Sequence, residues 1–190
     1  MLDINRSLLL LIDVQVKLFA AMNDKEALQA GIHTLVKGAG ILGIPILVTE
    51  QYPSGLGSTI PEVDALVKEI SARANPSNPP TNSIDKMTFS CWSDRRCRVE
   101  IEASGRNQIL LAGIEAHVCV YQTALDLLAA GYEVHVVTEA VGSRTARNKD
   151  LGLQKMRDAG AEITGIEMAL FELLRTAEAP AFREISRLVK

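Results

Sequence analysis

The sequence predicts an α/β protein, a three-layer αβα sandwich built around a parallel sheet of about six strands. Two observations indicate this fold. Short apolar runs recur along the chain without the alternation of a half-exposed strand, as in sheets that are covered on both faces. Segments of helical periodicity separate most of these runs, and strands that alternate with helices imply right-handed crossovers and parallel pairing.

The expected strands are the apolar runs 7–13, 44–50, 83–89, 108–114, 132–140 and, more weakly, 161–167. Helical patterns cover residues 24–43, 95–103, 117–130, 148–159 and 168–188. The last pattern is amphipathic, so its apolar stripe needs a surface to cover, either its own sheet or a second subunit. Because no internal repeat or linker is visible, residues 1–190 are predicted to form a single domain.

Residues 51–82 interrupt this rhythm and hold five of the seven prolines. A connection of this length in a compact domain is usually functional or disordered. It follows the carboxyl end of the second expected strand, where open α/β sheets bind ligands. We therefore expect a lid or a pocket wall; the alternative is a merely decorated connection.

Composition excludes several classes of protein. The net charge is −3, and charged residues are spread along the chain, so no tail for nucleic acid or membrane is expected. The N-terminal stretch lacks the features of a signal peptide, and no segment approaches the about 20 apolar residues that span a bilayer. Three cysteines without CxxC spacing argue against a disulfide framework and a zinc site, and favour a reducing cytoplasm.

Cys119 is the first candidate for chemistry, because it begins a helix directly after the fourth expected strand. A helix N-terminus carries about half a positive charge. We therefore expect this position to lower the thiol pKa and to favour the nucleophilic thiolate. The alternative is that Cys119 only fills space, since free cysteine is often buried. Cys91 and Cys97 lie away from any expected strand end and are interpreted as packing or surface residues.

Asp13 and Lys86 end two other strands, and parallel pairing brings such ends to the same edge of the sheet as Cys119. Asp13 follows five apolar residues, and a carboxylate there is costly unless it is paired. We expect a general base that takes the thiol proton and later returns it to a leaving group. The alternative for Asp13 is an N-cap of the following segment. Lys86 would keep Asp13 ionised and stabilise the thiolate, although most lysines are simply solvated.

The loop "GIEAH" at 113–117 is the expected oxyanion site. Backbone N–H groups there and at Cys119 would point to the position where an oxyanion forms. His117 is not assigned as the base, because side chains at i and i+2 do not face each other on a helical turn. His33, His117 and His135 lie on separate elements, so no metal is expected.

These residues stand in motifs that resemble the isochorismatase-like cysteine hydrolases. The resemblance covers nearly the whole chain, and its second motif looks like the isochorismatase-domain-containing branch. The motifs are "LLLIDVQ" at 9–15, "TEQYPSGLG" at 49–57, "IDKMTFSCW" at 84–92 and "LLAGIEAHVCVYQTALDLLAAGYEVHVVTEAVGSR" at 110–144. The last of them is highly specific.

The resemblance implies the sheet order 3-2-1-4-5-6 of a Rossmann-like fold and a catalytic triad of Asp13, Lys86 and Cys119. It also implies a cis peptide bond between Ile114 and Glu115. That bond would turn the N–H of Glu115 toward the oxyanion, beside the N–H of Cys119. Family members commonly assemble, so we expect a homo-oligomer, a dimer or higher.

The chain also departs from relatives within the superfamily. Nicotinamidases carry a metal-binding aspartate and histidines after the second strand, whereas this chain reads "TEQYPSG" there, at 49–55. This disfavours nicotinamidase activity and a bound metal, and no cofactor is expected. Isochorismatases need polar groups for two carboxylates, and no such pocket is identifiable in the sequence.

We therefore predict a metal-independent cysteine hydrolase that acts on a small amide or a related C–N or ester substrate through a thioester on Cys119. Phe19, Tyr52 and Trp92 are candidate pocket walls, with plain core packing as the alternative. Two other classes remain open: a ligand-binding or scaffold module without turnover, and a thiol redox sensor. A sensor has no need of a carboxylate and an ammonium together, which favours the enzyme.

Overall fold

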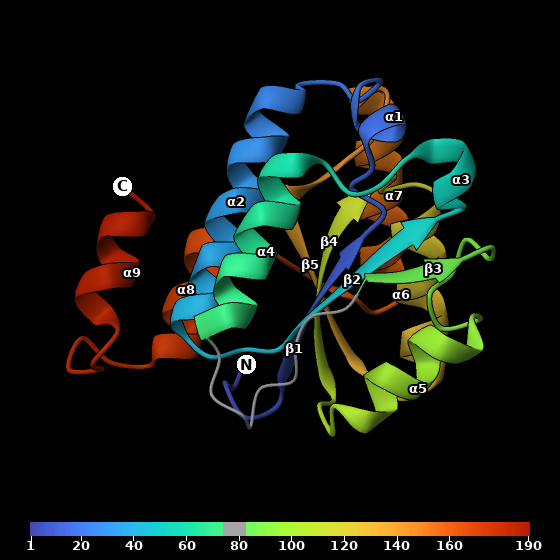
Figure 1. Ribbon diagram of the computed structural model, residues 1–190. Coiled ribbons are helices and arrows are strands. Elements are labelled where there is room, and N and C mark those ends of the chain that lie inside the picture. Colours follow the sequence, from blue (N-terminus) through green and yellow to red (C-terminus); the bar gives the residue numbers. More distant parts are fainter. Residues whose placement is uncertain (74–82) are drawn as a thin grey trace.

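The structure, a computed structural model, describes residues 1–73 and 83–190 and is a three-layer αβα sandwich (Figure 1). Its six-stranded sheet is parallel throughout and has the order β3-β2-β1-β4-β5-β6. The strands are β1 (Ser7–Ile12), β2 (Ile46–Gln51), β3 (Ser83–Lys86), β4 (Gln108–Ile114), β5 (Glu133–Gly142) and β6 (Glu162–Thr164). The predicted fold class and strand order are confirmed, although β3 and β6 are shorter than expected.

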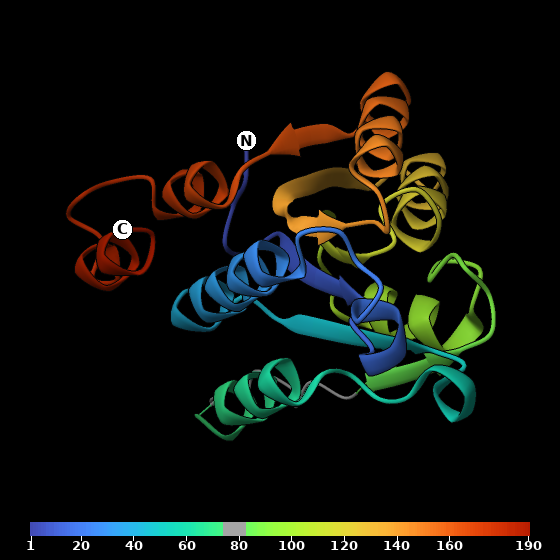
Figure 2. The same cartoon turned by 90° about the horizontal axis from the view of Figure 1, so that it is seen from above.

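Helices cover both faces of the sheet, as the view from above shows (Figure 2). One face carries α2 (Lys25–Ile41), α4 (Pro61–Arg73) and α8 (Ile166–Leu174), and the other carries α5 (Arg95–Ala103), α6 (Cys119–Ala129) and α7 (Ala146–Asp158). The C-terminal α9 (Phe182–Leu188) packs outside, against α2 and α8. The apolar stripe of α8 thus covers the chain's own sheet.

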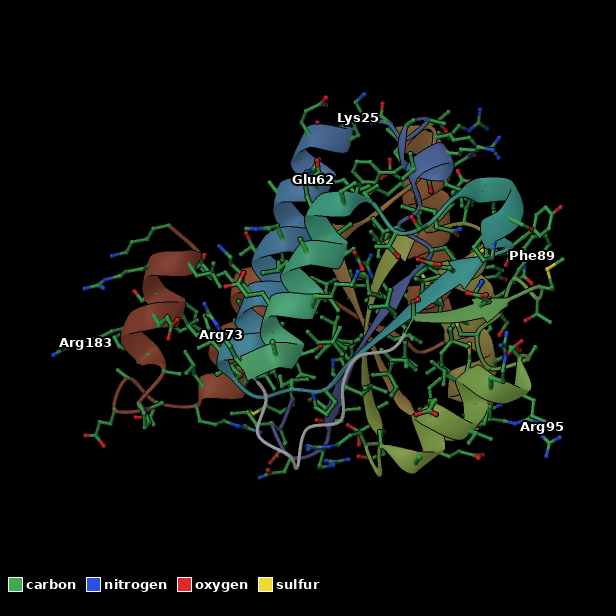
Figure 3. The ribbon with its side chains drawn as sticks, in the orientation of Figure 1. Lys25, Glu62, Arg73, Phe89, Arg95 and Arg183 are labelled. Carbon is green, nitrogen blue, oxygen red and sulfur yellow. The ribbon has the colours of Figure 1, made fainter. Side chains whose placement is uncertain are left out.

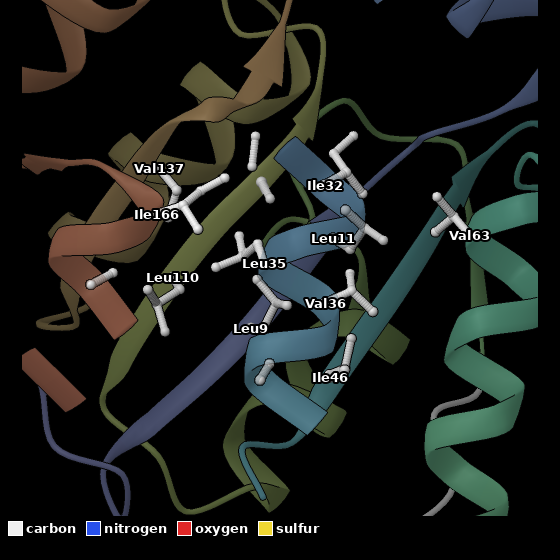
Figure 4. Close-up of a cluster of buried hydrophobic side chains, with 14 of the residues drawn as sticks. Leu9, Leu11, Ile32, Leu35, Val36, Ile46, Val63, Leu110, Val137 and Ile166 are labelled. Atoms are coloured by element: carbon white, nitrogen blue, oxygen red, sulfur yellow. The ribbon is translucent and has the colours of Figure 1, made fainter. Parts of the chain in front are cut away.

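The central strands form the core because both of their faces are buried. Leu9 and Leu11 of β1 pack toward α2 (Figure 4), whereas Leu8, Leu10 and Ile12 pack toward the opposite helices. Burying such a side chain contributes about 1.5–3 kcal/mol. This two-sided burial explains the unbroken apolar runs of the sequence and anchors the strands whose ends carry the polar residues.

The expectation of a long loop over residues 51–82 is wrong in part. The structure has a single-turn helix, α3 (Pro53–Leu56), and then the full helix α4, while residues 74–82 lie outside the described part of the chain. Proline is tolerated at the first helical position, where its missing N–H would lack a partner anyway. The buried residues of α4 are Val63, Leu66 and Val67. Residues 61–73 therefore cover the core beside α2 rather than form a lid.

Gly113 allows β4 to approach β1 just before the strand ends. Its φ of 115° is one that L side chains rarely adopt, and a Cβ there would collide with the backbone of Ile12. The pairing of β4 with β5 also shifts register between Leu111 and Gly113. A glycine is therefore required where the chain leaves the sheet toward Cys119.

Replacing Gly113 by alanine should lower the free energy of unfolding by about 3 kcal/mol or more, because strain and a backbone collision add. Gly43→Ala is the matched control, since Gly43 has a φ of 67° but open space around it. That variant should lose only about 1–2 kcal/mol. Urea unfolding followed by circular dichroism measures both, and equal losses would contradict the role given to the close approach.

Candidate active site

Asp13 follows β1 at the carboxyl edge of the sheet, and its side chain is fully buried. Its Oδ2 accepts a hydrogen bond from Lys86 Nζ at 2.7 Å, and its Oδ1 accepts one from Thr49 Oγ1 at 2.8 Å. The N-cap of the short helix α1 (Val16–Phe19) is Gln15, without a side-chain capping bond. The structure therefore excludes the N-cap alternative and directs the Asp13 carboxylate to β2 and β3.

Lys86 is the last residue of β3, and its side chain is as inaccessible as that of Asp13. Its Nζ also lies 2.9 Å from Gln51 Oε1 and 3.2 and 3.1 Å from the carbonyl oxygens of Thr88 and Phe89. Phe89 is in the turn beyond β3 (Figure 3). An ammonium has three protons, so these three acceptors together with the Asp13 carboxylate satisfy it fully. This coordination makes a buried lysine tolerable.

Cys119 begins α6 and is only 5% exposed. Burial and then the charge of Asp13 raise the pKa of its thiol; Lys86 acts in the opposite direction without offsetting them, and a hydrogen bond to Asp13 raises the pKa further. The predicted lowering of the Cys119 pKa is therefore wrong. The resting sulfur keeps its proton, and the Asp13 carboxylate is placed to accept it.

The same charges act on the lysine. Burial opposes the Lys86 ammonium, but Asp13 and the thiols of Cys91 and Cys119 outweigh this, so the pKa of Lys86 is raised. Lys86 therefore stays protonated throughout the neutral range. Its positive charge holds Asp13 in place rather than turning the thiol into a thiolate.

The loop from β4 to Cys119 is tied to the end of β5. The peptide bond between Ile114 and Glu115 is cis, at the position that the resemblance implies. The Glu115 carboxylate accepts hydrogen bonds from the N–H and Nε of Arg144 at 3.1 and 3.0 Å. The N–H of Ala116 donates to the carbonyl of Gly142 at 2.7 Å. These bonds hold the loop against the sheet edge.

Two N–H groups of this loop make no hydrogen bond within the described part of the chain. Within residues 1–73 and 83–190, neither the N–H of Glu115 nor that of Cys119 has a hydrogen-bond acceptor. His117 Nδ1 lies 3.0 Å from Ser143 Oγ, so its ring is engaged by the loop after β5. The loop thus carries two N–H groups without a partner among the described residues, and its His117 ring contacts Ser143.

The three aromatic candidates lie in different places. Tyr52 is beside the site: its N–H donates to the carbonyl of Lys86 at 3.0 Å, and its side chain is half-exposed. Phe19 is buried in the apolar cluster that faces α2. Trp92 packs edge-on against Tyr132, which precedes β5 at the opposite end of the sheet. Phe19 and Trp92 therefore both pack on the core, and their role as pocket walls stays a prediction.

Sequence reasoning missed three residues around the ion pair. Thr49 and Gln51 belong to the polar end of the otherwise apolar β2, and that change in character was the available signal. Cys91 is fully buried, and its Sγ lies 3.8 Å from Thr49 Oγ1. The expectation that Cys91 lies away from any strand end is therefore wrong.

A cavity of about 400 Å³ lies elsewhere, between β3 and α5. Its lining residues are Ser83, Ile84, Arg95, Arg96, Val99 and Glu100. None of the three candidate catalytic side chains belongs to this lining.

All three cysteines are free thiols. The described residues contain no group of three or more His, Cys, Asp or Glu side chains that could hold a metal ion. Within the same residues, no helix combines the length and apolarity needed to cross a membrane.

Fold and site together define a class: an αβα sandwich in which a buried Asp–Lys pair lies beside a cysteine at a helix start. A family model for the isochorismatase domain matches residues 7–168. The chain therefore belongs to the isochorismatase family and has its hydrolase fold.

Several relatives share most of this chain. The secreted isochorismatase effector Isc1 of Phytophthora sojae is 42% identical, with 84% of this chain and 73% of the relative covered. Isochorismatase domain-containing protein 2A of Mus musculus is 35% identical over 97% of this chain and 82% of its own. The match to isochorismatase domain-containing protein 1 of Danio rerio is 37% identical and covers 82% of this chain but only 51% of that protein.

Solved structures agree with the fold. The MAR1 ribonuclease of Caenorhabditis elegans superposes with a TM-score of 0.87 at 33% identity, over 99% of this chain and 91% of that one. YcaC of Pseudomonas aeruginosa, described with covalent acrylamide, has a TM-score of 0.85 at 26% identity, over 97% and 89%. YcaC of Escherichia coli, described as an octameric hydrolase of unknown specificity, has a TM-score of 0.87 at 25% identity, over 98% and 88%.

Replacing Lys86 by methionine should lower the free energy of unfolding by about 3–5 kcal/mol, because the Asp13 carboxylate is left buried without its cation. The pKa of Lys86 is raised above its ordinary value of 10.5 in the folded protein. The stabilisation by the Lys86 charge is therefore fully present below pH 10.5 and is lost only as the pH rises further. The loss of stability in the variant should thus be fully visible at pH 7.

Lys68→Met is the control, since the Lys68–Asp64 pair is also 2.7 Å long but exposed. Breaking it should cost about 0.3–0.5 kcal/mol. Denaturant unfolding measures both variants. Similar small losses would mean that the buried pair is dispensable for the fold.

Proposed function

We propose that the chain is a metal-independent cysteine hydrolase that acts on a small amide or a related C–N or ester substrate. The observation that carries this proposal is the shared position of Asp13. Its carboxylate is bound by the Lys86 ammonium, and its charge, together with burial, raises the pKa of the Cys119 thiol. The two unpartnered N–H groups of the adjoining loop supply the other requirement of acyl transfer.

The first half-reaction forms an acyl-enzyme. Asp13 takes the thiol proton as Cys119 Sγ bonds to the substrate carbonyl carbon, and the carbonyl oxygen becomes an oxyanion. The N–H groups of Glu115 and Cys119 bind that oxyanion. When the intermediate collapses, the C–N or C–O bond breaks, and the leaving group takes the proton from Asp13. A thioester on Cys119 remains.

The second half-reaction regenerates the thiol. Asp13 takes a proton from water while the water oxygen bonds to the thioester carbon. Collapse of this second intermediate breaks the C–S bond, and Asp13 returns its proton to the sulfur. Lys86 stays charged throughout, since its raised pKa keeps the ammonium protonated at neutral pH. The protein then holds the proton and charge arrangement with which it began.

The relatives support this proposal to different degrees. E. coli YcaC is described as a hydrolase, and the covalent acrylamide in P. aeruginosa YcaC requires a nucleophile in that protein. The C. elegans protein is described as a ribonuclease. This chain has a net charge of −3, which does not favour a polyanionic substrate. RNA is therefore a comparison substrate rather than the proposed one.

The surroundings of the site suggest its substrate and setting. Tyr52, Met87 and Phe89 expose large apolar surfaces next to the ion pair, and we propose that they meet an apolar part of the substrate. The octameric E. coli relative supports a homo-oligomer, a dimer or higher. Because the mechanism needs a free thiol, we propose a reducing cytoplasm as the working compartment. Residues 1–190 are proposed to act as one domain.

Cys119→Ala should abolish hydrolysis of any small amide, carbamoyl compound or ester that the wild-type protein turns over, because the nucleophile is removed. Mass spectrometry should detect an acyl adduct on wild-type Cys119 during slow turnover and none in the variant. Cys97→Ala is the control: it removes another buried thiol and should retain activity. Unchanged turnover in Cys119→Ala, or cleavage of RNA alone, would refute the proposed reaction.

Asp13→Asn should separate reactivity of the sulfur from catalysis. Loss of the carboxylate charge removes a cause of the raised Cys119 pKa, and each unit of decrease raises the thiolate fraction about tenfold. Alkylation of Cys119 by iodoacetamide at pH 8 should therefore be faster than in wild type. Hydrolysis should fall by about 10²–10⁴-fold, since the general base is lost. Slower alkylation would mean that Asp13 does not suppress the thiolate.

A further inference from the structure

Thr49 holds Asp13 at two points. The N–H of Asp13 donates to the Thr49 carbonyl at 3.1 Å, and the Thr49 hydroxyl donates to Asp13 Oδ1 at 2.8 Å. The register of the sheet places Thr49 opposite Ile12, the last residue of β1. A single residue of β2 therefore fixes both the main chain and the side chain of Asp13.

Each of these two hydrogen bonds stabilises a different part of Asp13, the first its main chain and the second its carboxylate. The φ of Asp13 is 53°, in the left-handed region that residues other than glycine adopt infrequently, so its main chain requires support. Its carboxylate, held at Oδ2 by Lys86 alone, would be free to turn about that bond. With Oδ1 on Thr49 and Oδ2 on Lys86, the carboxylate plane is set by two strands. The remaining lone pairs are left for the thiol of Cys119.

The surroundings leave the Thr49 hydroxyl without an alternative partner in solvent. Thr49 is fully buried, and Cys91 Sγ lies 3.8 Å from its Oγ1. Cys91 is itself anchored, because its N–H donates to Thr123 Oγ1 of α6 at 3.0 Å. The hydroxyl proton is thus committed to Asp13.

We propose that Thr49 is a positioning residue, whose hydroxyl sets the orientation of the Asp13 carboxylate for proton exchange with Cys119. The inference rests on the proposed hydrolase function. A fixed carboxylate keeps the proton-transfer geometry, which a displacement of about 1 Å can impair by about 10²-fold.

Thr49→Val tests this role, because it removes the hydroxyl while keeping the size and the main-chain carbonyl. Two measurements are made: kcat and KM for a hydrolysed substrate, and the rate of alkylation of Cys119 by iodoacetamide, read from the Cys119 peptide by mass spectrometry. The kcat should fall about 10–100-fold with little change in KM, because the carboxylate is misaligned for proton transfer. The alkylation rate should stay near that of the wild type, because the Asp13 charge is kept. Thr49→Ser should restore kcat.

Thr59→Val is the matched control. The Thr59 hydroxyl also donates to a buried carboxylate, Glu50 Oε1, at 2.7 Å, but it does not contact Asp13. This variant should keep the wild-type kcat. Thermal unfolding verifies that each variant is folded, and Thr49→Ala replaces Thr49→Val if the latter is not. An unchanged kcat in the folded variant, or a loss of kcat that Thr49→Ser fails to restore, overturns the positioning role.

Turnover by the wild type and by Thr49→Val distinguishes a failure of this inference from a failure of the proposed function. If the wild-type protein hydrolyses none of the test compounds, the proposed function fails, and the role of Thr49 in it fails with it. If the wild type turns over substrate and the kcat of Thr49→Val is unchanged, the function stands and the role of Thr49 is refuted.

Discussion

The buried ion pair between Lys86 and Asp13 is the interaction on which the site depends. Removing two charges from water costs several kcal/mol for each, and this is offset only where the remaining hydrogen bonds are all made. Here both carboxylate oxygens and all three ammonium protons have partners, supplied by β2, β3 and the turn that follows β3. The pair can exist only if three adjacent strands end at the same level. The apolar packing that aligns those strands therefore also builds the charged centre.

The same pair affects the protonation state of the Cys119 sulfur. An ammonium that is fully engaged by its own acceptors does little to draw a proton from a neighbouring thiol. The nearby carboxylate and burial act in the other direction, and the pKa of Cys119 is raised. In the proposed chemistry, the nucleophile thus rests as a thiol and becomes reactive only when Asp13 takes its proton. Reactivity would then be coupled to a substrate that accepts the sulfur.

Much of this architecture was accessible from the amino-acid sequence. Unbroken apolar runs separated by helical periodicity predicted the layered sheet, and the rule that strand ends share an edge grouped Asp13, Lys86 and Cys119. The strand order came from the resemblance to a family, and the structure confirms it. Helix α4 was missed because proline-rich flanks obscured its periodicity. The direction of the Cys119 pKa was missed because the prediction weighed the helix terminus without the desolvation of a buried site.

The sequence by itself determined which residues could be buried together and which polar groups end the central strands, because burial and periodicity are properties of the chain read locally. Only the tertiary structure decided which groups those polar residues meet. Thr49 faces Asp13, Gln51 faces Lys86, and Trp92 faces Tyr132 rather than the site. Such partners are set by distances between strands and helices far apart in the chain, and the shift of a pKa follows from them.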